Sequence, residues 1–313
     1  MTDGPRLRRP ADALPGLLAA LAFGVGAPAA QRVFAGVGRW TAGAWIALAS
    51  GTVFLVATRL GLRAPPPGPV TDTQRRRGRV ALLVSTGVGP VLGAWCALEG
   101  LARLSAHEAS LLLNLETLFT PLIAVAVFGE RLSPSRWVGA ALVLAGGVAC
   151  AAASGDAPGA GAASGGAPWI AASCLCWATD SNLLRYLVHR DAFTVARDKG
   201  LLGGAAAFVA AAATGEVPPL PGAATLAAGA AVGVVGFGAA LVGYLVSVRR
   251  VGTATTGALF GTGPFVGVLV AWLALGERPG LVFGAAAVAM AAGVGLLVRP
   301  HHPGAASHPV PGA

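Results

Sequence analysis

Charged residues are scarce in this sequence of 313 amino acids. Asp, Glu, Lys and Arg make up 11% of the chain, and Lys199 is the only lysine. A soluble domain has about 25% charged residues. Hydrophobic residues reach 55%, and the mean hydropathy is +0.71. Since so little polar surface excludes a water-soluble fold, we predict an all-α integral membrane protein.

The residues that catalysis would need are missing from the apolar runs. No run contains a histidine, since His107 lies at the edge of one and His189 in a loop. This excludes a Ser/His/Asp site at membrane depth. No Gly-Lys-Ser/Thr loop binds nucleotide phosphates, so no ATP-driven motor is built in. We expect no enzyme and no cofactor.

The four cysteines all fall inside apolar runs. They are Cys96, Cys150, Cys174 and Cys176. On a helix, residues two apart point in different directions, so Cys174 and Cys176 are not expected to share a metal. We interpret all four as small apolar side chains and expect no metal site.

The net charge of +9 predicts orientation in a membrane and no nucleic-acid partner, because the basic residues lie in short loops. Ten apolar runs predict transmembrane helices at roughly 14–34, 41–60, 80–100, 106–128, 135–153, 168–188, 195–214, 223–246, 252–275 and 280–298. With the N-terminus inside, 18 of the 22 basic residues fall on the cytoplasmic side. This bias predicts that both termini are cytoplasmic.

The segment 106–148 recurs in the second half of the chain. Gly129-Glu130-Arg131 is repeated as Gly276-Glu277-Arg278, and Gly139-Ala140 as Gly284-Ala285. In the same way, Ala22-Phe23-Gly24 aligns with Cys176-Trp177-Ala178. Five spans in each half, 14–153 and 168–298, require the second half to be inverted. Inverted repeats are typical of transporters, whose site lies near the midplane. Residues 154–167 are expected to be a flexible connector, and 299–313 a disordered tail.

Glu116 lies near the centre of its predicted span, where a carboxylate costs about 2.5–3.5 kcal/mol and is usually functional. It could contact substrate or carry a proton; the alternative is a buried structural bond between helices. On a helical projection it shares a face with Thr120, whereas Asn114, which is also a candidate for substrate contact or coupling, shares the other face with Thr117 and Pro121.

Asp180 is the second acid near the middle of a span. It either pairs with Lys199, in a structural or gating role, or faces a cavity and titrates. Asn182 and Arg185 are three apart and can be neighbours on one helix. Trp177, also near mid-span, is a candidate for lining the cavity.

Several further residues are predicted to shape helix ends and bends. Glu130, Arg131 and Glu277 are expected to end their helices at the membrane interface and to fix the following turn. Pro121 and Pro264 lie inside predicted spans, where proline kinks a helix and allows a hinge or a static bend. The small residues of the fifth and tenth spans permit close packing, within the monomer or between two copies in a homodimer.

These motifs resemble the EamA family of the drug/metabolite transporter superfamily. The resemblance rests on Gly129-Glu130-Arg131-Leu132 followed by Gly139-Ala140, and on Pro264 and Glu277 followed by Gly284-Ala285. It implies ten helices in two inverted five-helix repeats and alternating access around a central cavity. The two repeats differ at two matching positions. Thr117 in the first repeat stands where the second has Pro264, and Gly263 in the second repeat stands where the first has Glu116.

We therefore expect a secondary transporter, working as an exporter of a small metabolite or drug-like molecule, with proton coupling through Glu116 or Asp180. The alternatives are an uncoupled facilitator and a non-transporting scaffold or lipid-handling protein. The expected partners are membrane lipid and the substrate. The alanine- and arginine-rich composition favours the bacterial inner membrane.

Overall fold

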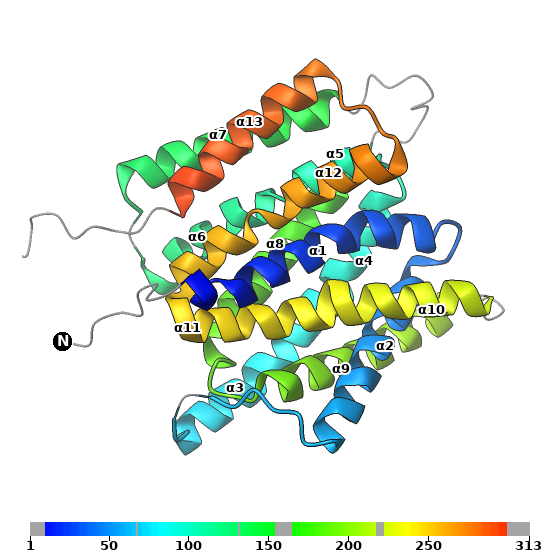
Figure 1. Ribbon diagram of the computed structural model, residues 1–313, viewed down its shortest axis with the longest axis vertical. Helices are drawn as coiled ribbons and strands as arrows, with labels where there is room; N and C mark the ends of the chain where they lie inside the picture. Colours follow the sequence, from blue (N-terminus) through cyan, green and yellow to red (C-terminus); the bar gives the residue numbers. More distant parts are fainter. Residues whose placement is uncertain (1–9, 67, 131, 154–164, 217–221, 299–313) are drawn as a thin grey trace, which may run out of the picture.

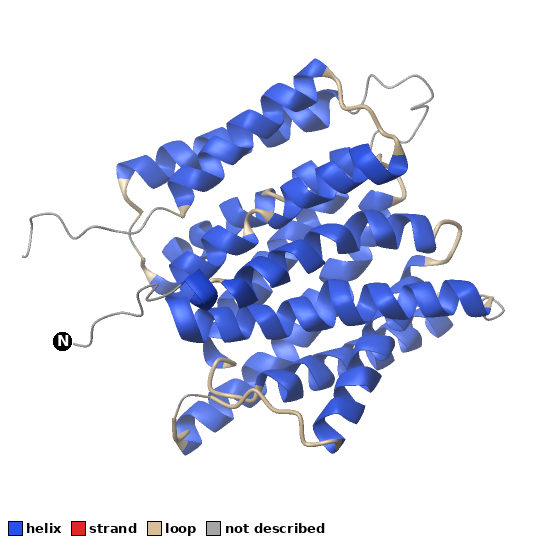
Figure 2. Cartoon of the chain, in the orientation of Figure 1, coloured by secondary structure: helices blue, strands red, loops and turns tan. Residues whose placement is uncertain are grey.

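The computed structural model describes residues 10–66, 68–130, 132–153, 165–216 and 222–298, and all regular structure in this part of the chain is helical (Figure 2). Arg131 lies outside the described residues, as do residues 154–164 of the connector and the tail 299–313. The first half contains η1 (Pro10–Asp12), α1 (Leu14–Val33), α2 (Arg39–Arg59), α3 (Asp72–Thr86), η2 (Gly87–Gly93), α4 (Ala94–Leu101), α5 (Ala106–Leu112), α6 (Leu115–Phe128) and α7 (Pro134–Ala153). The second contains α8 (Gly166–Leu183), η4 (Leu184–Tyr186), α9 (Ala192–Ala213), α10 (Ala223–Ala231), η5 (Val232–Ala239), α11 (Ala240–Phe260), α12 (Gly263–Leu275) and α13 (Leu281–Leu297).

These helices cross the bundle ten times within the described residues, as predicted. Seven helical segments are long and apolar enough to span a membrane, and α13 is a shorter apolar helix. The helices α8 and α9, which contain Asp180 and Lys199, are not among the seven. The chain enters α1 and leaves α13 at the same end of the bundle (Figure 1). We call this the inner end, because it is the end predicted to be cytoplasmic, and the opposite end the outer end.

The two halves pack as pairs of equivalent helices. α2 packs along α9 at one edge of the bundle, and α7 packs along α13 at the other (Figure 1). Between these edges α1 contacts α12 and η5, just as α8 contacts the equivalent elements α6 and η2. This exchange of partners is the packing expected of duplicated, inverted halves.

Glycines bring the paired helices into backbone contact. A Cβ atom on Gly51 would lie 2.5 Å from the backbone nitrogen of Leu201, and one on Gly200 would lie 2.5 Å from Cα of Gly51. Gly139 and Gly293 approach each other in the same way between α7 and α13. These small residues thus serve helix packing inside the monomer.

The fourth span of each half is helical from end to end, as predicted for 106–128, but its regular α-helical hydrogen bonding is interrupted near the middle by a tighter turn. α5 ends at Leu112 and α6 begins at Leu115; in the second half α11 ends at Phe260 and α12 begins at Gly263. At the first interruption the Asn114 side chain donates to the carbonyl of Leu111 (3.0 Å), and such local bonds compete with regular helix.

Pro264 occupies the first turn of α12. At this position the missing N–H group of proline costs nothing. Pro264 therefore begins a helix, whereas the sequence had suggested a kink inside one. Pro121, by contrast, lies inside α6.

The third span of each half contains a π-helical stretch, η2 in the first half and η5 in the second. Such widened turns are rare and occur frequently at functional sites. Both stretches face the centre of the bundle, since η2 packs on α8 and η5 on α1.

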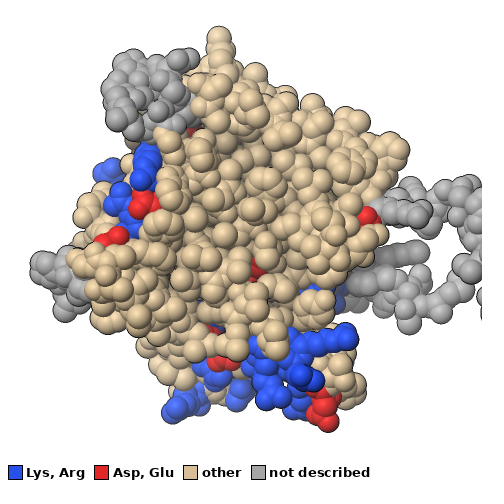
Figure 3. Space-filling view, turned by 180° about the vertical axis from the view of Figure 1, so that it is seen from behind, with Lys and Arg blue, Asp and Glu red and all other residues tan. Residues whose placement is uncertain are grey.

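Charged side chains gather toward the ends of the bundle, and the broad face between them is almost uncharged (Figure 3). Arg75, Arg76, Arg77 and Arg79 are all exposed in the first two turns of α3. The almost uncharged face is the expected lipid-facing surface of a multi-pass integral membrane protein.

Candidate functional site

A cavity of about 140 Å³ lies at the centre of the bundle, where both halves meet. We call it the central cavity. Its walls come from α1, α2, η2, α6, α8, α9, η5 and α11. The fold therefore places the site at the repeat interface, where inverted-repeat carriers bind substrate.

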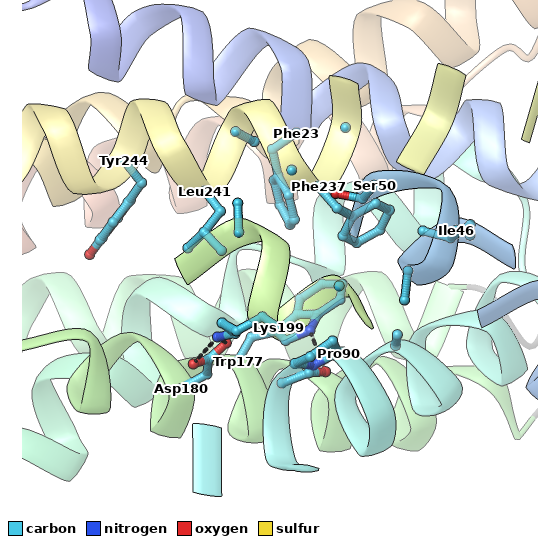
Figure 4. A pocket seen from close by; sticks show the side chains of 18 of the residues that line it. Phe23, Ile46, Ser50, Pro90, Trp177, Asp180, Lys199, Phe237, Leu241 and Tyr244 are labelled. Atoms are coloured by element: carbon cyan, nitrogen blue, oxygen red, sulfur yellow. Dashed lines mark hydrogen bonds and ion pairs between the residues drawn. The ribbon is translucent and has the colours of Figure 1, made fainter. Parts of the chain in front are cut away.

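The central cavity has one aromatic side and one charged side. Figure 4 shows Phe23, Phe237 and Tyr244 on one side, facing Asp180 and Lys199 on the other. Phe260 extends the aromatic wall and contacts Phe23, with ring centroids 5.0 Å apart. The cavity thus offers both apolar contact and charge to a molecule inside it.

Lys199 and Asp180 form an ion pair in the cavity wall. Lys199 Nζ lies 2.6 Å from Asp180 Oδ1 and Oδ2, and the side chains are 5% and 14% exposed. The two alternatives for Asp180 are not exclusive, because it pairs with Lys199 and also lines the cavity. Gly89 on η2 makes room for the carboxylate, since a Cβ atom there would clash with it.

Glu116 lines the central cavity from the first turn of α6. The Ser181 hydroxyl donates to its Oε1 atom at 3.0 Å. Among the described residues no Lys, Arg or His forms an ion pair with Glu116. Within the described cavity walls, Glu116 is therefore an acid without a cationic partner.

A second cavity of about 470 Å³ extends from Glu116 to the inner end. We call it the inner cavity. It shares Phe23, Glu116, Ser181, Leu184, Tyr244 and Phe260 with the central cavity. Pro121 and Pro264 line it, as do Asn182, Arg185 and Glu130.

Arg185 stands beside the inner mouth of this cavity in a network of polar contacts. It donates to the backbone oxygen of Asn182 at 3.1 Å and to the Asn182 side chain at 3.0 Å. Its Nη1 atom lies 3.3 Å from Glu130 Oε1, and its guanidinium stacks on Phe128. Asn182 in turn donates to the Thr120 carbonyl at 3.0 Å, which ties α8 to α6.

Toward the outer end the passage narrows to an apolar gap of about 20 Å³. Three rings surround it, those of Phe23, Trp177 and Phe237, and we call them the aromatic cluster. The rings meet edge to face with centroids 5.5–6.5 Å apart, and Trp177 Nε1 donates to the Gly89 carbonyl at 3.2 Å. A gap this small holds at most a water molecule. The central cavity is therefore open inward and closed outward.

Two predicted residues lie away from this site. Asn114 is fully buried between α5 and α6 and does not line the central or the inner cavity, and its Oδ1 atom has no hydrogen-bond partner among the described residues. Glu277 lies at the outer end, where it accepts hydrogen bonds from the first residues of α5. Arg131 lies outside the described residues.

The sequence reasoning missed several residues of the site. Ser181 and the aromatic residues Phe23, Phe237 and Phe260 were not singled out. For Phe23 a signal existed, because it aligns with Trp177 in the repeat. Ser181 follows Asp180 directly, but nothing in the sequence shows that it reaches α6.

Among the described residues no three His, Cys, Asp or Glu side chains cluster. The charged groups of the site form ion pairs with each other or face the cavities. The arrangement suits non-covalent binding of a small molecule.

Comparisons with known proteins agree with this architecture. Residues 13–150 and 164–299 each match the model of the EamA-like transporter family. No protein of curated function matches the chain. One solved structure, titled only as the crystal structure of a protein, superposes with a TM-score of 0.66 at 20% sequence identity. The match covers 92% of this chain and 96% of the other, and it shows a shared fold.

Proposed function

Because the chain belongs to the EamA-like transporter family, we propose that it is a secondary carrier that exports a small amphipathic molecule by alternating access, coupled to protons through Glu116. The observation that carries this proposal is the position of Glu116. Its carboxylate lies where the central cavity meets the inner cavity, with Ser181 as its hydrogen-bond donor. An intramembrane carboxylate in a cavity is the usual carrier of protons in such proteins.

The direction of transport is supported by the shape of the passage. The inner cavity reaches from the predicted cytoplasmic end to Glu116, whereas the aromatic cluster blocks the way outward. A substrate would thus load from the cytoplasm. We place the protein in the bacterial inner membrane on its arginine- and alanine-rich composition.

The walls of the central cavity support an amphipathic substrate. Phe23, Phe237 and Tyr244 offer apolar and aromatic contact, while Glu116 offers a negative charge. Protonation of Glu116 would release a cationic or hydrogen-bonding group of the substrate. Competition of proton and substrate for one carboxylate is the simplest way to couple their movements.

The geometry disfavours the scaffold alternative, because a purely structural Glu116 would lie in a packed helix interface. Its side chain lines two cavities whose volumes are about 140 and 470 Å³. An uncoupled facilitator has the same cavities, and only transport measurements separate it from a coupled carrier.

The test is counterflow in proteoliposomes with pooled metabolites, with and without a pH gradient. Wild type should accumulate a compound when the gradient is imposed. Glu116→Gln should lose the gradient-driven component, and any exchange that remains should be slow and independent of pH, because the amide mimics the protonated carboxyl that releases substrate. Glu99→Gln is the matched control, because Glu99 pairs with Arg103 near the outer surface (2.5 Å) and lines neither cavity. Unchanged coupling in Glu116→Gln would refute the role of this carboxylate, and transport without any pH dependence would favour the facilitator.

A further inference from the structure

The two repeat-related glutamates Glu130 and Glu277 are presented by the same backbone turn. Gly129 and Gly276 both adopt positive φ, at 67° and 72°. The N–H of Glu130 donates to the carbonyl of Ala124 at 3.3 Å, and that of Glu277 to the carbonyl of Ala271 at 3.1 Å. Each helix thus ends in an αL glycine, and the N–H of the following glutamate folds back onto the carbonyl six residues earlier. The identical geometry directs one carboxylate to each end of the bundle.

At the outer end, the Glu277 carboxylate is bonded to the start of α5. It accepts from the N–H groups of Ala106 (3.0 Å) and His107 (2.8 Å), and it lies 2.6 Å from His107 Nδ1. The first N–H groups of a helix have no partner within the helix, so this carboxylate caps α5. Glu277 follows α12, and the cap therefore joins α12 to α5.

At the inner end, Glu130 makes a different contact. Its carboxylate pairs with Arg185 at 3.3 Å, and its side chain is 54% exposed, against 24% for Glu277. The spacing that relates Glu277 to Glu130 also relates Gly252 to Ser105, and Thr253 to Ala106. Gly252 interrupts α11 with φ 82° and ψ 166°, so a new helical segment begins at Thr253. Its first N–H groups are the equivalents of those that Glu277 caps.

Helix packing shows the same asymmetry. α12 packs closely against α5 at the outer end (Figure 1). The equivalent pair, α6 and the last turns of α11, makes no comparable contact within the described residues. The inner cavity separates them, with Thr120 and Ala124 on one side and Thr253 and Gly257 on the other. The open cavity keeps Glu130 from its equivalent cap.

We infer that Glu130 and Glu277 are alternating latches, of which only the outer one is closed in this conformation. When the inner cavity closes, Glu130 leaves Arg185 and caps the segment that starts at Thr253. When the outer passage opens, Glu277 releases Ala106 and His107. The inference rests on the proposed alternating access, and it makes the two glutamates positioning residues that contact helix ends and not substrate.

The test measures how accessible the inner cavity and the apolar gap are to a labelling reagent, and it needs no substrate. Full-length protein in vesicles of either orientation receives one cysteine reporter, Val248→Cys in the inner cavity or Ala27→Cys at the apolar gap. A membrane-impermeant maleimide then labels each reporter from its own side. The protein without a reporter gives the background from the native cysteines, three of which are buried. The readout is the ratio of inner to outer labelling rates.

Removing the closed latch should favour the outward-open state. We expect Glu277→Ala to lower the inner-to-outer ratio about fivefold, the effect of losing one helix cap. Glu130→Ala should raise the ratio by a similar factor. The inward-closed state loses its helix cap, whereas the inward-open state loses only the exposed ion pair with Arg185, which contributes less than a cap. Thr253→Pro should act like Glu130→Ala, since proline is tolerated at the first helical position and lacks the N–H group that Glu130 would bind.

Glu216→Ala is the matched control. Glu216 also caps a helix at the outer end, accepting from the N–H of Trp40 at 2.8 Å, but it joins α9 to α2, which stay packed along their length. It should leave the ratio unchanged.

Opposite shifts for the Glu130 and Glu277 variants support the latches. If wild type labels from both sides but both variants behave like Glu216→Ala, or shift in the same direction, the latch inference fails while alternating access stands. If wild type labels from one side only and no variant changes that, the latch inference and alternating access both fail. Size-exclusion chromatography checks folding, and Glu277→Gln replaces a Glu277→Ala protein that does not fold, with the same expected direction.

Discussion

Lys199 Nζ lies midway between the two carboxylate oxygens of Asp180, 2.6 Å from each, and the pair forms part of the wall of the central cavity. The pair joins α8 to α9 across the centre of the second half. Since the two charges neutralise each other, Glu116 remains an acid without a cationic partner within the described cavity walls. Because this pair lines the cavity and also joins α8 to α9, a molecule bound in the cavity can affect how these two helices are positioned.

Breaking this pair should destabilise the protein more than replacing both partners. Asp180→Asn or Lys199→Gln leaves one buried charge without its partner, which costs about 3–5 kcal/mol. The double variant Asp180→Asn/Lys199→Gln leaves two neutral groups that can hydrogen-bond, so it should recover most of the loss. Thermal unfolding in detergent measures all three. If the double variant is as unstable as the sum of the single variants, the two residues do not act as a pair.

The aromatic cluster should control leakage toward the outer side. Phe237→Ala removes one of the three rings around the apolar gap, so a Ser50→Cys reporter in the central cavity should react at least several-fold faster with an external maleimide. Phe208→Ala is the control, because Phe208 on α9 is 52% exposed on the outside of the bundle. Equal labelling in Phe237→Ala and wild type would show that another contact closes the passage.

The duplicated architecture could be predicted because it depends on features that the sequence displays directly. The apolar runs, the arginine bias and the repeated Gly-Glu-Arg turns together indicate ten helices in two inverted halves. Asp180 and Lys199 could also be named as candidates, since buried charges need partners. These predictions use only the residues along each helix and do not require the contacts between helices.

The remainder depends on contacts between helices, and sequence periodicity does not reveal them. The projection of Glu116 and Asn114 assumed regular α-helical spacing, whereas i→i+3 hydrogen bonds tighten the turn at Leu113 and Asn114. Ser181 reaches Glu116 only because α8 packs on α6. Glu130 and Glu277 have the same motif and different partners, because one end of the bundle is closed and the other open.

Close packing of α2 on α9 should tolerate no side chain at Gly200. A Cβ atom there would lie 2.5 Å from both Cα and the nitrogen of Gly51, so the backbone would have to move. We expect Gly200→Ala to lower the stability by about 1–3 kcal/mol, the usual cost of overpacking. Gly284→Ala on α13 is the control, because among the described residues no atom outside its own stretch of helix lies within 4 Å of the added Cβ. It should be neutral or stabilise by up to about 1 kcal/mol, because alanine favours a helix. Equal unfolding temperatures for the two variants would contradict the close approach.

Arg185 distinguishes a gating role from a substrate contact. In the inward-open conformation it holds Glu130 at 3.3 Å, and its own position is fixed by two bonds to Asn182. If it acts through Glu130, Arg185→Gln should free the latch and lower the inner-to-outer labelling ratio without substrate. The expected change is about two- to fivefold, since an exposed ion pair contributes up to about 1 kcal/mol. Arg75→Gln is the control, because Arg75 pairs with Asp72 at 4.0 Å on the exposed start of α3. A raised KM with an unchanged labelling ratio would instead make Arg185 a substrate contact. Both effects together would mean that substrate and Glu130 compete for the same guanidinium, so that loading from the cytoplasm would itself release the inner latch.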